Sequence, residues 1–238
     1  MHFMKQHILA VGLITLSASV SASTITWTTQ AFTDTTQISP LSNVLSAYNY
    51  GNSATVAVNG VDFVGHDALT QDDAVFRFGQ SGAKMNHNSG DSYDAANTVT
   101  GLSVADANAL MDFFSYNDQT NMNWLMTLKN LQIGETYQIQ AIVVDDRAAQ
   151  SGRNMHFGPD GNSWGAAYDY TSAGAPLLAT GTFVADATTQ DFRQGYQGTG
   201  APQFNAMIIS TTAVPEPSSL VLLAAGTVAL MSVRRRLR

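Results

Sequence analysis

The sequence predicts an all-β domain, a β-sandwich of the jelly-roll type with one short helix. Three observations favour this class. Short segments that alternate apolar and polar residues recur along the chain, polar segments rich in Gly, Asn and Asp separate them, and only one segment has a helical pattern. The chain contains no cysteine, so disulfides and cysteine-bound zinc are excluded and a hydrophobic core must stabilise the domain.

The first predicted elements are a strand and a long loop. Thr24 to Gln30 alternates, which places Ile25 and Trp27 on one side of a strand. Thr33 to Asn52 shows no clear periodicity, and we therefore predict a loop over that range.

A hairpin is predicted between Ala54 and Gly65. Asn59 and Gly60 both tolerate positive φ, which suits the two-residue type I′ turn. The turn sets the register, so four apolar side chains share one face. The predicted pairs are Val58 with Val61 and Val56 with Phe63, and Ala57 and Asp62 point outward.

The middle of the chain contains the one predicted helix. A short strand over Ala74 to Phe78 comes first, and the polar segment from Gly79 to Gly101 is predicted to be a loop. Ser103 is a candidate N-cap, with Asp106 three residues later. The apolar face of the helix would consist of Leu110, Met111, Phe113 and Phe114.

The remaining strands follow at short intervals. We predict a strand from Asn123 to Leu128, a turn around Gly134, and a longer strand from Thr136 to Asp145. The last becomes apolar on both sides, and we expect it inside a sheet. Further strands are predicted over Asn154–Phe157, Leu178–Ala185 and Phe204–Ser210.

Both ends of the chain have the composition of export signals. A basic residue, an apolar run and small residues fill positions 1–22, which predicts a signal peptide that signal peptidase cuts between Ala22 and Ser23. The domain then spans 23–213. In 214–238, an uncharged run from Leu220 to Val233 is just long enough for one membrane-spanning helix. The arginines that would hold its end in the cytoplasm are Arg234, Arg235, Arg236 and Arg238.

The C-terminal segment resembles the PEP-CTERM sorting signal of Gram-negative bacteria that make extracellular polysaccharide. Pro215, Glu216 and Pro217 precede the apolar run and the basic end, in the order of that family. The resemblance implies that a membrane peptidase, the exosortase, recognises these three residues. It also implies an inner-membrane-anchored precursor that is later released or re-attached at the cell surface.

A second resemblance concerns the domain. The Asn59-Gly60-Val61 hairpin, the turn that contains Leu131, Gly134 and Tyr137, and the pair Asp145 and Arg147 are similar to a jelly-roll module of exported bacterial proteins. The segment Phe204–Ile209 is similar to its closing strand. The module implies a fold but no activity.

The charge of the mature domain disfavours nucleic acid as a partner. Without Lys5, the four terminal arginines and Glu216, 6 of the 11 basic and 17 of the 18 acidic residues remain, a net charge near −11. Such a surface repels phosphate backbones.

No catalytic constellation is convincing, and we predict a non-catalytic protein. Gly161–Gly165 matches the nucleophile-elbow string, but every histidine precedes the serine, contrary to the order that the elbow needs. Glycoside hydrolysis needs two facing carboxylates. Asp72-Asp73 and Asp145-Asp146 are sequential and would point to opposite faces, and Arg147 is a partner for solvated charge there. A hydrolase that uses aspartates is the alternative.

Neither a metal nor a cofactor is predicted, with calcium as the open alternative. The oxygen donors Asn86, Asn88, Asp91 and Asp94 occur in one polar segment, but their spacing is not that of an EF-hand. Asn and Asp in such segments usually serve turns.

Polysaccharide binding is the sharper hypothesis for the domain. Trp164, Tyr168 and Tyr170 lie in a Gly-rich segment, and the two tyrosines would share a face if the chain is extended. Aromatic rings beside Asn and Asp are typical of carbohydrate sites. The alternative is that these rings cover the edge of the sandwich.

Overall fold

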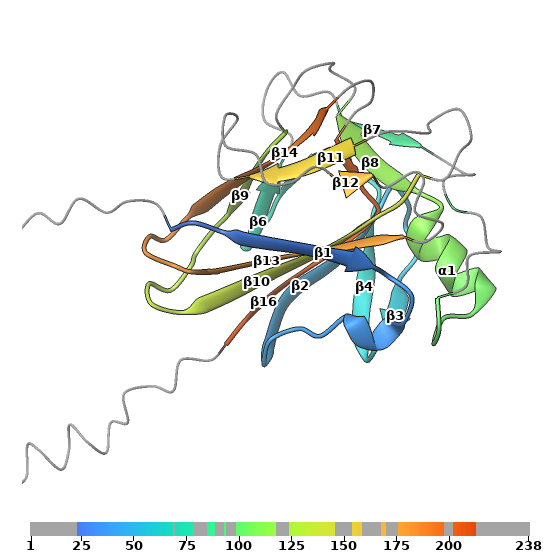
Figure 1. Ribbon diagram of the computed structural model, residues 1–238, viewed down its shortest axis with the longest axis horizontal. Helices are drawn as coiled ribbons and strands as arrows, with labels where there is room; N and C mark the ends of the chain where they lie inside the picture. Colours follow the sequence, from blue (N-terminus) through green and yellow to red (C-terminus); the bar gives the residue numbers. More distant parts are fainter. Residues whose placement is uncertain are drawn as a thin grey trace, which may run out of the picture.

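A computed structural model describes residues 23–68, 70–78, 85–88, 93, 99–117, 124–145, 154–158, 168–169, 176–197 and 202–212. The described chain is a β-sandwich with one α-helix at one end (Figure 1), in agreement with the predicted class. No helix within these ranges combines the length and the apolar character that crossing a membrane requires. The predicted signal peptide and sorting segment lie outside the described residues.

The larger sheet has seven strands in the order β1-β13-β10-β16-β2-β4-β3. Its neighbours are antiparallel, except that β2 and β4 run parallel. Its strands are β1 (Thr26–Ala31), β2 (Asn43–Tyr50), β3 (Val56–Val58), β4 (Val61–His66), β10 (Thr136–Val143), β13 (Leu177–Val184) and β16 (Ala206–Thr211). As predicted, β10 lies inside the sheet, between β13 and β16.

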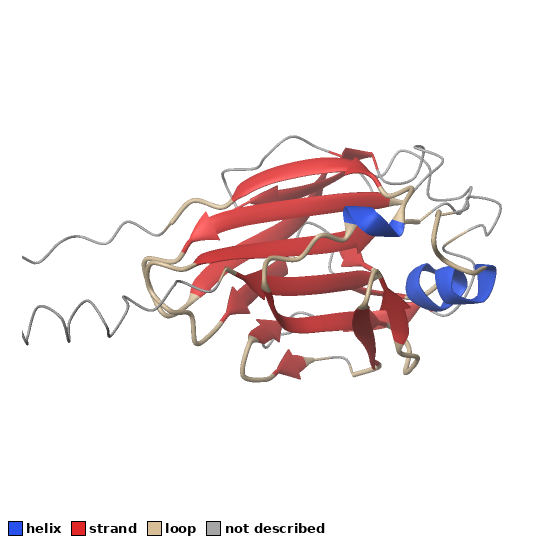
Figure 2. Ribbon diagram, turned by 90° about the horizontal axis from the view of Figure 1, so that it is seen from below, coloured by secondary structure: helices blue, strands red, loops and turns tan. Residues whose placement is uncertain are grey.

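The opposing sheet has six strands in the order β12-β11-β14-β9-β6-β5. These are β5 (Gln71–Asp72), β6 (Phe76–Phe78), β9 (Trp124–Leu128), β11 (Asn154–Gly158), β12 (Tyr168–Asp169) and β14 (Gln190–Gln197). A small third sheet consists of β15 (Gln203–Phe204), β8 (Phe114–Asn117) and β7 (Met85–Asn88). Figure 2 shows the long strands side by side, with the helix beyond one of their ends.

The main core lies between the two large sheets. Tyr137, Ile139 and Met207 from the larger sheet pack in one cluster with Phe76 and Phe192 from the other. The ring of Trp27 also stacks on Phe157, with centroids 4.4 Å apart. Because these side chains alternate along their strands, each sheet contributes one face to the core.

A second core covers part of the outer face of the larger sheet. Ile142, Leu178 and Ile208 point away from the main core and are buried together with Phe63 of the hairpin and Leu110 of the helix. The cover is supplied by the helix α1 (Val104–Met111), the 3-10 turn η1 (Thr35–Gln37) and the β3–β4 hairpin.

The predicted hairpin and helix start are confirmed in detail. Val58 pairs with Val61 and Val56 with Phe63. Asn59 and Gly60 have φ of 49° and 78°, as a type I′ turn requires. The helix begins after Ser103, whose side chain accepts from the Asp106 amide.

The loop predicted over Thr33 to Asn52 is wrong, because this range contains η1 and the eight-residue strand β2. A register shift between Ile209 and Ser210 of β16 marks an irregularity in the β2 pairing. Such an irregularity disturbs the two-residue alternation from which a strand is recognised.

Three further predictions need correction. Phe113 and Phe114 do not belong to the helix, which ends at Met111, and Phe114 begins β8. Asn205 Nδ2 donates to the carbonyls of Met111 and Phe113 at this point. The predicted loop from Gly79 contains β7, and β14 was not predicted because its sequence is mostly polar. Asp145 is buried and not solvated.

Candidate functional site

The predicted ligand residues are described only in part. Tyr168 opens β12, and its backbone pairs with Met155 of β11 at the edge of the six-stranded sheet. Trp164 and Tyr170 lie outside the described residues, as do Ala22, the three sorting residues and the four arginines. Ser23, the predicted first residue of the mature chain, donates through Oγ to Gln190 Oε1 at 2.7 Å.

The predicted calcium donors are likewise described in part. Asn86 and Asn88 lie in β7, which is a paired strand, and Asp91 and Asp94 lie outside the described residues. Across the described ranges, no group of three His, Asp or Glu side chains is placed to hold a metal ion.

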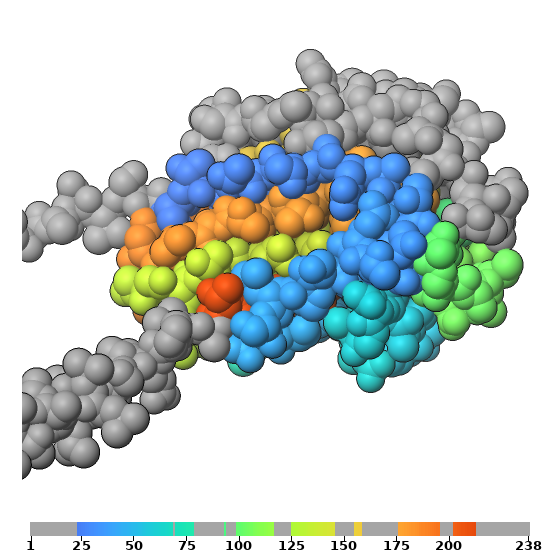
Figure 3. Space-filling model, turned by 60° about the horizontal axis from the view of Figure 1, so that its bottom comes forward, coloured from blue at the N-terminus to red at the C-terminus, as the bar shows by residue number. Residues whose placement is uncertain are grey.

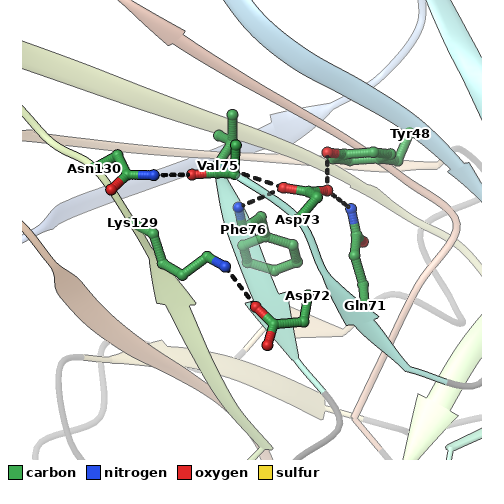
Figure 4. A network of polar contacts seen from close by, with 9 residues as sticks. Tyr48, Gln71, Asp72, Asp73, Val75, Phe76, Lys129 and Asn130 are labelled. Carbon is green, nitrogen blue, oxygen red and sulfur yellow. Dashed lines mark hydrogen bonds and ion pairs between the residues drawn. The ribbon is translucent and has the colours of Figure 1, made fainter.

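A polar cluster surrounds Asp73, and we call it the Asp73 network (Figure 4). Asp73 follows β5 in the six-stranded sheet, whereas Tyr48 lies on β2 in the seven-stranded sheet. The network, which also includes Gln71, therefore joins the two sheets of the sandwich.

Both oxygens of the Asp73 carboxylate are occupied. Oδ2 accepts from Tyr48 Oη at 2.5 Å and from Gln71 Nε2 at 2.6 Å. Oδ1 accepts from the backbone amides of Val75 and Phe76 at 2.7 and 2.9 Å. Tyr50 Oη extends the network by donating to Gln71 Oε1 at 3.0 Å. A carboxylate with four donors has no oxygen directed at an open space, and its role here is to connect elements.

The protonation states agree with that role. Burial alone would raise the pKa of Asp73, but the hydrogen bonds from Tyr48, Gln71 and the two amides outweigh it and lower the pKa below its ordinary value. Burial, followed by the hydrogen bond to Asp73, raises the pKa of Tyr48 to about 12. Near neutral pH the phenol is therefore a donor and the carboxylate an acceptor.

The neighbouring carboxylate points elsewhere. Asp72 forms an ion pair with Lys129 at the end of β9, so the two sequential aspartates diverge as the sequence predicts. They do not form the facing pair that glycoside hydrolysis needs.

A second buried polar group lies where the last strand ends. Glu135 Oε2 accepts from Tyr137 Oη at 3.3 Å and from Thr211 Oγ1 at 3.1 Å. Tyr137 Oη in turn accepts from the Gln132 amide at 2.8 Å. The turn motif with Gly134 at φ 90° thus fixes the end of β16, immediately before the sorting segment.

Several other carboxylates in the described ranges also have structural partners. Asp34 accepts from the Thr36 amide at the start of η1, and Asp106 accepts from the Ser103 hydroxyl at the start of α1. Asp191 accepts from Thr127 across the β14–β9 pair. These contacts stabilise turns, helix starts and strand pairs.

The comparisons with known proteins identify the tail. Residues 213–236 match the PEP-CTERM protein-sorting motif, so the chain carries the motif that its sequence resembles. No protein of curated function was found to match the chain.

Solved structures resemble the domain only distantly. A β-glucuronidase of Bacteroides uniformis is 12% identical with a TM-score of 0.44, over 69% of this chain and 17% of that chain. A calcium-binding mutant of Bacteroides uniformis β-glucuronidase 2 is 13% identical with a TM-score of 0.45, over 69% of this chain and 18% of that chain. The chain thus spans under a fifth of those proteins, and likeness at this level implies no shared activity.

Proposed function

We propose that this chain, which carries a PEP-CTERM protein-sorting motif, is an exosortase-processed surface or matrix protein whose β-sandwich binds polysaccharide without cleaving it. The observation that carries the proposal is the motif at residues 213–236. Such a motif implies an exported protein that is processed at the membrane.

The sorting step rests on the order of parts in the tail. Pro215 and Pro217 restrict the backbone to extended geometry, so Glu216 is presented on a stiff segment before the apolar run. The run from Leu220 to Val233 then inserts into the inner membrane, and the arginines after it stay on the cytoplasmic side. Exosortase and signal peptidase are the partners that follow from this arrangement.

The non-catalytic role is supported by the use of the carboxylates. Asp73 is saturated by four donors, and Asp72 is paired with Lys129. Glu135 is buried under Tyr137 and Thr211. A general acid or base must reach a substrate proton. Asp73 and Glu135 are directed at protein atoms, whereas the Asp72 side chain is 65% exposed and its Oδ1 is paired with Lys129.

The proposed polysaccharide contact is at the β12 edge of the six-stranded sheet. Tyr168 is placed there by its pairing with β11, and Trp164 and Tyr170 are its near neighbours in the sequence. Aromatic rings suit the faces of sugar rings, which is the reason for proposing the contact at this edge.

Glycan binding and turnover can be measured on the same protein. We expect the mature protein to bind polysaccharide from an exosortase-containing host without releasing reducing ends. We expect Trp164→Ala to weaken this binding. Ile133→Ala, which alters an exposed turn before β10, is the matched control. Absence of binding at every concentration would leave only a structural role, and release of reducing ends by the unmodified protein would favour the hydrolase.

The sorting step has its own test. In a host with exosortase, Glu216→Gln should leave an unprocessed precursor in the inner membrane, whereas Ser218→Ala should be processed normally. Normal processing of Glu216→Gln would contradict recognition of the acidic side chain.

A further inference from the structure

Exposed aliphatic side chains gather at the end of the sandwich where β16 ends. Six large hydrophobic residues are exposed in the described part of the chain. Four of them are Val44 at 43%, Leu45 at 40%, Ile133 at 66% and Val184 at 52%. We call these four residues the exit pole, because the chain leaves the domain among them.

The strand registers place the exit pole around Thr212. Thr136 pairs with Val184 on one side, and its carbonyl accepts from the Thr212 amide. On the other side, Ser210 pairs with Val44. Ile133 lies in the turn before β10, which is joined to the end of β13 by a hydrogen bond from Gly134 to Ala185. The four residues therefore lie at the end of the sheet where Thr212, the last described residue, follows β16.

The figures show the same arrangement. In Figure 1, β16 ends at the side where β1 begins and where the β9–β10 and β13–β14 turns lie, away from α1. Figure 3 shows the end of β16 at the surface between β10 and β2, with α1 at the opposite end.

The exit pole has little charge. Strands β1, β2, β10, β13 and β16 contain no Asp, Glu, Lys or Arg. The nearby Glu135 is buried and accepts two hydrogen bonds, and Asp186 follows β13 at a partly exposed position. Lys129 begins the β9–β10 connection but is ion-paired with Asp72, and Asp191 near the start of β14 is exposed. This end therefore has no excess of basic side chains to attract anionic lipid headgroups, and a membrane contact here would depend on apolar side chains.

The tail limits how far the exit pole lies from the membrane. Seven residues, 213–219, separate Thr212 from the apolar run, and a fully extended chain of that length spans at most about 25 Å. The tether also gives a high effective concentration, so a few weakly inserting side chains suffice for contact. They are too few for the roughly 1,200 Å² or more that a stable protein interface buries.

We propose that the exit pole rests on the outer leaflet of the inner membrane while the precursor is anchored, with Ile133 and Val184 inserted at the headgroup level. The proposal rests on the membrane anchoring that the proposed function includes. The occupant is an uncharged lipid surface. The contact orients the sandwich, and it ends when the tail is cut.

Single cysteines can report the contact, because the chain has none. The full chain would be inserted through its tail into phosphatidylcholine vesicles that contain spin-labelled headgroups. A fluorophore would be attached at Ile133→Cys, at Val184→Cys, or at Val104→Cys on α1, whose side chain is 57% exposed. We expect several-fold stronger quenching at the first two positions than at the third, with little dependence on salt.

A charge introduced at the exit pole distinguishes contact with lipid from tethering near the bilayer without contact. With the label at Val184→Cys, adding Ile133→Asp should reduce the quenching, because a carboxylate at the headgroup level repels the pole from the apolar boundary. Unchanged quenching would mean that the tether alone holds the domain near the bilayer, and the proposal would be wrong.

The remaining outcomes are distinguishable. If the chain floats with vesicles but the three labels are quenched equally, the exit pole does not contact lipid, and the sorting proposal is unaffected. If the chain does not float with vesicles, both proposals fail. The label at Ile133→Cys could instead be protected from solvent by protein. Protection that grows with protein concentration in detergent, or that requires exosortase, would assign the exit pole to a protein partner and overturn the lipid contact.

Discussion

Aliphatic residues are buried at one end of the seven-stranded sheet and exposed at the other. At one end, Ile142, Leu178 and Ile208 are buried under the helix, the 3-10 turn and the hairpin. At the other, Val44 and Val184 are exposed beside the exit of the chain. The same sheet therefore carries its own cover at one end only.

The difference follows from connection length. The covered end has the connections β1–β2 and β6–β9, which contain η1 and α1, and the β3–β4 hairpin. The exit pole has the β9–β10 and β13–β14 turns and the first and last described residues. Short turns cannot cover a sheet face, so aliphatic side chains there remain exposed unless something outside the domain covers them.

Truncation should be costly at the covered end and nearly neutral at the exit pole. Ile142 is fully buried and Ile133 is 66% exposed. We expect Ile142→Ala to lower the free energy of unfolding by about 2–5 kcal/mol and Ile133→Ala by less than about 0.5 kcal/mol. Urea unfolding of the mature protein measures both. Equal losses would mean that Ile133 is packed within the domain and that the two ends do not differ.

The hydrogen bond between Tyr48 and Asp73 should contribute less to the free energy of unfolding than the buried side chain of Ile142. Tyr48→Phe removes one of the four hydrogen bonds to Asp73, and we expect a loss of about 1–2 kcal/mol, because Tyr48 is only partly buried. Val44→Ala, on the same strand and at a 43% exposed residue, is the comparison variant for general effects on β2. A loss at Tyr48→Phe no greater than at Val44→Ala would show that the network does not hold the sheets together.

The same variant has a predicted pH dependence. Asp73 has a lowered pKa in the folded protein, so its contribution is present above its ordinary pKa of 3.8 and is lost as pH falls through the lower folded value. Tyr48 has a pKa raised from 10.0 to about 12, so its contribution is present below 10.0 and is lost as pH rises toward 12. We expect the stability difference between the wild type and Tyr48→Phe to be constant near neutral pH and to shrink at both extremes. A difference that grows above pH 10.0 would contradict the assigned donor.

Removing the N-cap of α1, one of the elements that cover the sheet, should lower the stability by a smaller amount. Ser103 accepts from the Asp106 amide at 3.1 Å and begins α1, and we expect Ser103→Ala to cost about 1 kcal/mol. Ser103→Asp keeps an acceptor at the N-cap and should restore most of the stability. Equal losses for both variants in thermal unfolding would exclude a capping role.

The turn of the hairpin should show the smallest effect. Gly60 has φ of 78°, and a Cβ there would meet nothing within 4 Å, so Gly60→Ala adds only backbone strain, about 1 kcal/mol. Gly60→Asn, which tolerates this region better, should cost less than Gly60→Ala. The reverse order would mean that contacts, and not backbone strain, decide the effect.

Local signals predicted the parts of the fold that local physics determines. The Asn59-Gly60 turn sets its own register, and Ser103 is a cap by its own hydroxyl, so both were predicted to the residue. Strand β2 was not predicted, because its pairing with β16 is irregular and its partner β4 comes later in the chain. Its spacing of Tyr48 and Tyr50 by two residues was the one available signal.

The polar networks could not be predicted for a related reason. Tyr48 and Asp73 are brought together only when two sheets pack, and Asn205 reaches the end of α1 from a segment more than ninety residues away. Side chains that connect distant segments leave no periodic pattern. The sorting segment is the opposite case, because its three parts are contiguous and its recognition needs no fold.

The mass of the protein recovered from outside the cytoplasm shows whether both export signals are cut. In a host that contains exosortase, we expect a species that begins at Ser23 and lacks the apolar run and the arginines of 220–238. An intact chain of 238 residues, recovered folded from the cytoplasm with both ends uncut, would contradict the account.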